Sequence, residues 1–282
     1  MMRQLLARGG RRLTQEQWDM VASEQRQSTA LYCRLAVRVL STWTSSTPLA
    51  QCVLPKSVGA LIEFILEAVE REFGREWTRV ALACLTFSRA GLSDGKMQNV
   101  LSFNDERVLN HVFQYFSSDV RRFPLHVWLR LKGALEGLLV EREGARAVWY
   151  HRQLRETAEA RYAAGGENEL AHQLLAQYFG DLCGARGEER LMARQPLTLD
   201  GGWVWFSSAK INTRRCVEAP YHLVAAGMSM REEACRELCS VELVCACAKV
   251  GQIYELLKVL IVLARGGAGG ERVDSGSADT SV

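Results

Sequence analysis

Several features that often reveal a protein's function are missing from this 282-residue chain. Its net charge of +3 is too small to predict a polyanionic partner. The uncharged runs of its most apolar region, such as 259–264, are far shorter than the roughly 20 residues needed to cross a bilayer. No long apolar run follows the arginine-rich start, so no signal peptide is predicted. We therefore expect a cytoplasmic protein with no membrane partner, and a mitochondrial presequence over residues 1–13 is the alternative.

The sequence also lacks the common catalytic and metal-binding motifs. No Gly-x-Ser-x-Gly elbow is present, and Cys33, Cys84 and Cys183 have no base partner that the sequence identifies. Cys235 and Cys239 lie one helical turn apart, but the Cys-x-x-Cys spacing of zinc knuckles is missing. We therefore expect no catalytic residues, no metal, no cofactor and no enzymatic activity, with the cysteines present as reduced thiols.

What the sequence has in abundance is helical periodicity. Apolar residues between 56 and 73 form one stripe along a helix, and Gly74 follows where helices commonly end. Thr14 and Gln17 have the spacing of a capping box at the start of an earlier helix. The predicted fold class is therefore mainly α.

One segment, 138–150, departs from this helical pattern. Its apolar spacing changes from 3.6 to about 2, and Glu143-Gly144 is typical of a tight turn between two strands. Gly91-Leu92-Ser93 reads as a turn, and Ser93 as the N-cap of the helix after it. The helices predicted before the hairpin cover 77–88, 94–102, 105–117 and 124–137. This order of elements predicts a winged helix with a small β-hairpin wing.

Short motifs along the chain resemble one family. Residues 83–93 and 149–156 resemble the winged-helix segment of STAND-class NTPases with NACHT motors, in the telomerase-associated and nephrocystin-like branch that carries WD or tetratricopeptide repeats. Residues 31–36 and 53–58 resemble the end of that family's ATPase lid, and 214–227 resembles the helical segment after its winged helix. Each motif is degenerate, but their order and spacing together are fairly specific.

The resemblance implies a division of the chain into parts. These are a helical lid remnant (1–55), a winged-helix domain with a leading helix (56–163), an α-helical hairpin array (164–264) and a disordered tail (265–282). The tail is rich in Gly, Ser and Asp and cannot form a core. In the loop before the array's last helices, Trp203-Val204-Trp205 is expected to anchor the chain against those helices.

The resemblance also assigns a role to His151. In the family, a histidine at the start of the helix after the wing reaches the β-phosphate of ADP, and His151 matches that position. Helix starts favour anions, which suits such a contact. No Gly-x-x-x-x-Gly-Lys-Ser/Thr motif is present, so ADP or ATP is expected only if another chain supplies the motor domain. The alternative is a capping or packing histidine.

The leading hypothesis is a non-catalytic regulatory or interaction module that works by protein–protein contact, with a protein partner or self-association. The second hypothesis is a winged-helix nucleic-acid-binding protein. Its candidate phosphate contacts are Arg121, Arg122, Arg130 and Lys132, beside or on helix 124–137. Acidic residues interrupt this surface, so nucleic-acid binding is the less favoured hypothesis. The third hypothesis is a truncated gene product without independent activity.

Overall fold

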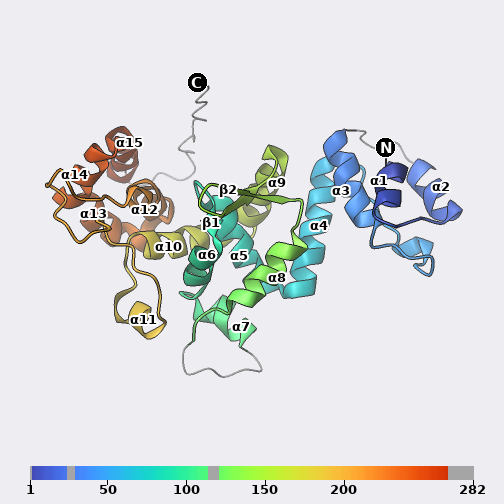
Figure 1. The fold of residues 1–282 in the computed structure, drawn as a ribbon, viewed down its shortest axis with the longest axis horizontal. Helices are drawn as coiled ribbons and strands as arrows, with labels where there is room; N and C mark the ends of the chain where they lie inside the picture. Colours follow the sequence, from blue (N-terminus) through green and yellow to red (C-terminus); the bar gives the residue numbers. More distant parts are fainter. Residues whose placement is uncertain (1, 24–28, 114–120, 266–282) are drawn as a thin grey trace.

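The computed structural model describes residues 2–23, 29–113 and 121–265. Helices dominate these residues and surround one small antiparallel sheet, which confirms the predicted mainly α fold class (Figure 1). All but the first residue of the predicted disordered tail 265–282 lies outside the described residues. No described helix combines the length and the apolar character needed to span a membrane.

The first helices lie at one end of the molecule, drawn in blue in Figure 1. Their bounds are α1, Met2–Arg8; α2, Gln15–Ser23; and α3, Ala30–Leu40. The capping box is present, because the Thr14 hydroxyl accepts from Gln17 N–H (3.2 Å) and the Gln17 amide oxygen accepts from Thr14 N–H (3.0 Å). The short helix α1 was not predicted from the sequence.

Helix α4, Val58–Phe73, follows a 3₁₀ turn at Leu49–Gln51 and buries its predicted apolar stripe. Ser57 caps its start by accepting from Ala60 N–H, and Gly74 ends it with a φ of 100°. Helix α5, Arg75–Phe87, then packs against α4 and is almost entirely buried. These two helices form the centre of the larger hydrophobic core.

The middle of the chain carries the predicted hairpin and one unexpected strand. Its elements are β1, Leu92–Ser93; α6, Asp94–Leu101; a π-helical turn, Asp105–Leu109; α7, Asn110–Val112; α8, Leu125–Ala134; β2, Leu139–Arg142; and β3, Arg146–Trp149. The strand order is β1-β3-β2, all antiparallel. The predicted helix 105–117 is described as a π-helical turn followed by a short α-helix, and residues 114–120 lie outside the described part.

The turn predicted at 91–93 was wrong, because Leu92 and Ser93 pair with Ala147 and Arg146 as strand β1. Gly91 makes this pairing possible: a Cβ at this position would lie 2.4 Å from the Ala147 carbonyl oxygen. Ser93 does occupy the N-cap of α6, but its side chain makes no capping hydrogen bond there.

Helices α9, Arg152–Ala164, and α10, Glu167–Phe179, complete the first core through a buried ion network. Arg79 pairs with Glu167 (2.8 Å) and Glu70 (3.3 Å), and Arg161 also pairs with Glu70 (2.8 Å). Burial alone would raise the pKa of Glu167, but hydrogen bonds from Arg79 and Arg107 outweigh burial and lower it. The network therefore ties α4, α5, α9 and α10 together with compensated charges.

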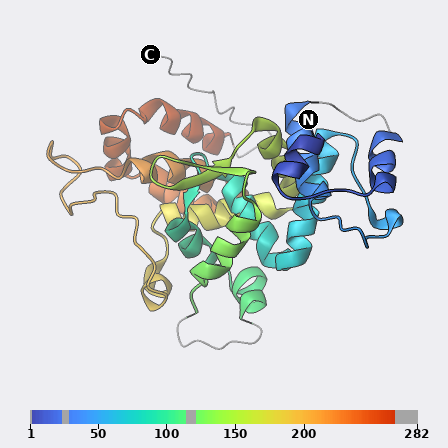
Figure 2. The same cartoon turned by 45° about the vertical axis from the view of Figure 1, so that its right-hand side comes forward.

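A second, smaller core lies at the opposite end of the long axis from α1–α3, drawn in orange and red (Figures 1 and 2). Its helices are α12, Thr213–Ala225; a 3₁₀ turn, Gly227–Met230; α13, Arg231–Leu238; α14, Val241–Lys249; and α15, Ile253–Ala264. The segment predicted as an irregular loop, 184–206, also contains a short helix, α11, Gly184–Glu189.

Candidate functional site: a cationic cavity at the start of helix α9

His151 is the N-cap residue of α9 and is exposed to solvent. Its Nδ1 accepts a hydrogen bond from Gln153 N–H at 3.2 Å. An accepting Nδ1 places the proton of a neutral imidazole on Nε2, which has no hydrogen-bond partner among the described residues. The side chain thus serves as a helix cap and also presents an Nε2 donor to solvent.

A cavity of about 420 Å³ opens beside His151. Its lining comes from the end of α5, the loop 88–91, the strands β2 and β3, and the first turn of α9. The lining contains four arginines, Arg89, Arg142, Arg152 and Arg155, together with His151, and it contains no carboxylate. Such a concentration of cations beside a helix start favours an anionic group.

Three of these arginines have carboxylate partners outside the cavity lining. Arg152 pairs with Glu156 and Arg155 with Glu159, each one helical turn along α9. Arg89 lies 3.6 Å from Glu255. The Arg152–Glu156 pair is exposed and contributes little, so this guanidinium can exchange partners at small cost when an anion enters. Arg89 is held more firmly, because it also donates to the Val217 carbonyl and lies over the Tyr221 ring.

The loop 88–91 that forms one wall is held from behind by Glu218 of α12. The Glu218 carboxylate is fully buried and accepts from the backbone N–H groups of Arg89 and Ala90, each at 3.2 Å. Arg214 pairs with the same carboxylate at 2.9 Å. Burial alone would raise the pKa of Glu218, but the hydrogen bond with His222 and the charge of Arg214 outweigh burial and lower it.

Two buried histidines extend the hydrogen-bond chain from Glu218 to α10. His222 Nε2 lies 2.9 Å from Glu218, and its Nδ1 lies 2.8 Å from Nδ1 of His172. Burial, followed by the neighbouring His222, lowers the pKa of His172 to about 3. We call Glu218, His222 and His172 the polar seam, because they join the two cores. The seam was not predicted from the sequence, although Glu218 and His222 are spaced one turn apart on a partly apolar helix.

The candidate phosphate contacts of the nucleic-acid hypothesis do not line the cavity beside His151, and each has a contact within the protein. Arg122 donates to Asn99 (3.0 Å), and Arg121 donates to Asn110 (2.5 Å). The Arg130 guanidinium lies 5.9 Å from the ring centre of Phe73.

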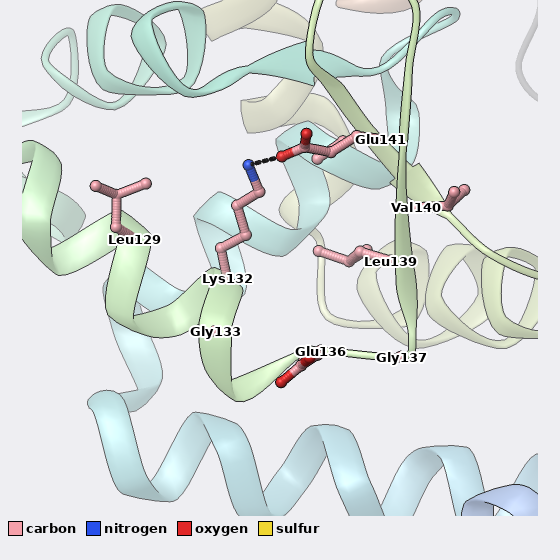
Figure 3. A pocket seen from close by; sticks show the side chains of 9 residues that line it. Leu129, Lys132, Gly133, Glu136, Gly137, Leu139, Val140 and Glu141 are labelled. Atoms are coloured by element: carbon pink, nitrogen blue, oxygen red, sulfur yellow. Dashed lines mark hydrogen bonds and ion pairs between the residues drawn. The ribbon is translucent and has the colours of Figure 1, made fainter.

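Lys132 is half-buried and lines a separate hollow between α8 and β2 (Figure 3). Its ammonium donates to Asp94 (2.9 Å) and Glu141 (2.6 Å). Burial alone would lower the pKa of Lys132, but these carboxylates outweigh burial and raise it. The structure therefore does not gather the four cations into one unpaired patch.

The side chains of the two tryptophans that were expected to anchor the loop before α12 face solvent. Trp203 and Trp205 are 65% and 48% exposed and stack with ring centres 6.0 Å apart. Val204, between them, is the buried residue and belongs to the second core. The anchor is thus valine, and the tryptophans form an exposed aromatic surface together with Phe206.

Within the described residues, no group of three or more His, Cys, Asp or Glu side chains has the arrangement of a metal site. Cys235 and Cys239, which the sequence places one turn apart, are both exposed free thiols.

Comparison with known proteins confirms the resemblance to the NACHT class. The mouse NACHT domain- and WD repeat-containing protein 1 is 35% identical over 160 residues, which are 52% of this chain and 10% of that protein. Its human counterpart is 31% identical over 208 residues, which are 69% of this chain and 13% of the relative. Mouse telomerase protein component 1 is 25% identical over 280 residues, or 94% of this chain and 10% of the relative.

The chain therefore spans about a tenth of the length of these relatives. No protein-family model matches the chain, and no solved structure matches it.

Proposed function

We propose that this chain is a non-catalytic regulatory module, equivalent to the arm that follows the motor in a NACHT-class switch, and that it acts by protein–protein contact. The observation that carries the proposal is the cationic cavity at the start of α9. Its four arginines lie around His151, whose Nε2 is available to a phosphate oxygen. The relatives' names supply the NACHT context in which such a phosphate would be presented.

We interpret α5 to β3 as a winged helix, in agreement with the motifs. Three principal helices, α5, α6 and α8, precede the hairpin β2–β3, and β1 adds a third strand to it. In this interpretation α9 is the helix after the wing, so His151 stands where the family's phosphate-contacting histidine would stand. The cavity then faces the motor, and bound ADP favours the closed arrangement through a contact that only this arrangement provides.

The exposed aromatic surface supports an interaction role. Trp203, Trp205, Phe206 and Leu199 are each 48% or more exposed and lie within one ordered loop. The bridge between Thr198 and Ile211 and two backbone N–H bonds to Asp200 hold this loop in shape. Exposed tryptophan and phenylalanine are enriched where proteins bind one another.

The proposal is tested with the NACHT domain of the mouse relative, expressed without the segment that matches this chain. The full chain and the ADP-loaded domain are mixed at rising concentration, and the complex is measured by size-exclusion chromatography with light scattering. We expect a one-to-one complex. Absence of a complex, when the domain still binds ADP by itself, would refute the proposal.

A further inference from the structure

A pocket of about 230 Å³ opens at the end of the molecule where α1 lies beside α2 (Figures 1 and 2). It shares no lining residue with the cavity at α9 or with the hollow between α8 and β2. Its charged lining residues are three arginines, Arg3, Arg11 and Arg12, and no carboxylate lines it. The other lining residues are Leu6, Ala7, Leu13, Gln15 and Trp18. We call it the arginine pocket.

The turn after α1 brings two of these arginines to the pocket. Gly10 N–H donates to the Ala7 carbonyl at 3.0 Å, and Arg11 N–H donates to the carbonyl two turns of chain earlier, that of Leu6, also at 3.0 Å. These two bonds form a Schellman motif, and Gly10 has the positive φ, 69°, that the motif requires. The chain therefore leaves the helix axis at this point, and Arg11 and Arg12 line the pocket.

The third arginine is held by an aromatic ring. The Arg3 guanidinium carbon lies 4.8 Å from the ring centre of Trp18 on α2, which is a cation–π contact. This contact uses none of the N–H donors of the guanidinium as hydrogen bonds. None of the guanidinium groups of Arg3, Arg11 and Arg12 forms a hydrogen bond or an ion pair with a residue that the structure describes. The pocket therefore concentrates positive charge that the described part of the chain does not neutralise.

The start of α2 adds backbone donors with the same preference. The Thr14 hydroxyl accepts from Gln17 N–H, whereas the N–H groups of Gln15 and Glu16 have no acceptor among the described residues. Free amides and the positive end of the helix dipole favour an anion. The Asp19 carboxylate accepts from the Gln15 side chain at 2.7 Å, and neither Asp19 nor Glu16 lines the pocket.

Charge and size together select the class of anion. A single phosphate group carries about −1.5 to −2 at neutral pH, which is less than the charge of the three guanidinium groups. Two linked phosphate groups supply more charge and enough oxygens for three arginine forks. A volume of about 230 Å³ lies below the roughly 300–1,000 Å³ of pockets for drug-sized ligands, so the ligand is small.

We propose that the arginine pocket binds a diphosphate, either inorganic pyrophosphate or the diphosphate group of a small ester. Arg11 and Arg12 donate to it from the turn after α1, and Arg3 donates from α1 itself. Gln15 N–H donates from the start of α2. This site goes beyond the proposed contact with a motor and does not rest on it, because the two surfaces share no residue.

The first probe is inorganic pyrophosphate, titrated into the full ¹⁵N-labelled chain and followed by NMR. The Gln15 and Glu16 amide resonances report on the arginine pocket and not on the cavity at α9, which also contains arginines. We expect saturable shifts of both resonances, with pyrophosphate bound at least about tenfold more tightly than orthophosphate. Affinity should fall as salt rises, because the arginines are exposed.

The second probe is ADP, which distinguishes the two sources of the diphosphate. Shifts of the same amides at a similar affinity assign the pocket to diphosphate esters as well. Shifts with pyrophosphate alone assign it to the free ion. Both results support the proposal.

The variants test whether the arginines themselves hold the ligand. Arg11→Gln and Arg12→Gln should each weaken pyrophosphate binding about fivefold or more, because each removes a charge-assisted bond. Arg8→Gln is the matched control and should leave the affinity within about twofold. Arg8 is also exposed and lies in the last turn of α1, but it does not line the pocket.

Three results would overturn the proposal. The first is the absence of a shift at Gln15 and Glu16. The second is an equal loss of affinity in Arg8→Gln and Arg12→Gln, which would show a general effect of net charge. The third is a set of shifts confined to residues around His151, which would place the diphosphate in the cavity at α9 instead.

Discussion

The two hydrophobic cores of this molecule differ in how their polar side chains are buried and paired. The first core encloses charged side chains in a complete network of Arg79, Arg161, Glu70 and Glu167 between four helices. The second core is smaller, meets the first through the polar seam, and leaves large apolar side chains such as Trp203 and Tyr254 exposed. The comparison suggests a rigid scaffold at one end and a contact surface at the other.

The largest expected effect is on the first core. Glu70 is 1% exposed, and Glu70→Ala removes one carboxylate partner from Arg79 and from Arg161. Arg79 keeps Glu167 and Arg161 keeps Glu63, so the free energy of unfolding should fall by about 3 kcal/mol, the lower end of the range for a broken buried pair. Its control is Glu67→Ala, which breaks the exposed pair with Arg71 and should cost less than about 1 kcal/mol. Urea unfolding measures both. Similar losses in the two variants would show that the network does not hold the first core.

The seam should make stability depend on pH. The pKa of His172 is lowered to about 3 in the folded protein. The unfolded chain therefore takes up this proton first, and stability that is complete above pH 6.5 is lost as pH falls. The loss should reach about 2.5 kcal/mol by pH 4.5.

Urea unfolding between pH 7 and 4.5 measures this loss, and His172→Phe should remove most of it. His111→Phe, at an exposed position, is the control and should keep the slope. A slope that persists unchanged in His172→Phe would contradict the account of the seam.

A smaller effect on stability should separate the buried Val204 from the exposed Trp203 in the loop before α12. Val204 is 6% exposed and Trp203 is 65% exposed. Val204→Ala should cost roughly 1–2 kcal/mol through lost apolar burial, whereas Trp203→Ala should leave stability within about 0.5 kcal/mol. Thermal unfolding compares the two. A larger loss for the tryptophan would restore the sequence-based expectation that it anchors the loop.

The smallest expected signal concerns nucleic acid. Lys132, Arg122 and Arg121 already have hydrogen-bond partners in the protein. We therefore expect little retention of duplex DNA or RNA in filter binding, even at about 50 mM salt, and no steep salt dependence. A log–log slope equivalent to several phosphate contacts would favour the winged-helix nucleic-acid hypothesis instead.

Much of the fold followed from local pattern. The stripe of α4, the capping box at Thr14 and the hairpin turn at Glu143-Gly144 are encoded in adjacent residues, and the structure contains them. Strand β1 could not be predicted from local pattern. It has only two residues, which show no periodicity, and its pairing depends on a distant partner, Ala147.

The candidate site was predictable only in part. The position of His151 came from resemblance, but Arg89 and Arg142 join it through contacts between distant segments. In the polar seam, only the pair of Glu218 and His222 lies within one helical turn, whereas His172 is 50 residues from His222 and no local pattern could join them. The solvent-facing orientation of Trp203 and Trp205 could not be predicted either. Apolar residues alternate in direction along this loop, but the sequence does not say which set is buried.

The central claim is that His151 couples this chain to a nucleotide-bound motor, and His151→Asn tests it most directly. Asparagine can keep the N-cap of α9 but lacks the imidazole Nε2. The measurement is the Kd between the chain and the relative's NACHT domain, with and without ADP. We predict that ADP tightens the wild-type complex about tenfold and has little effect on His151→Asn. An equal response to ADP in both proteins would contradict the account.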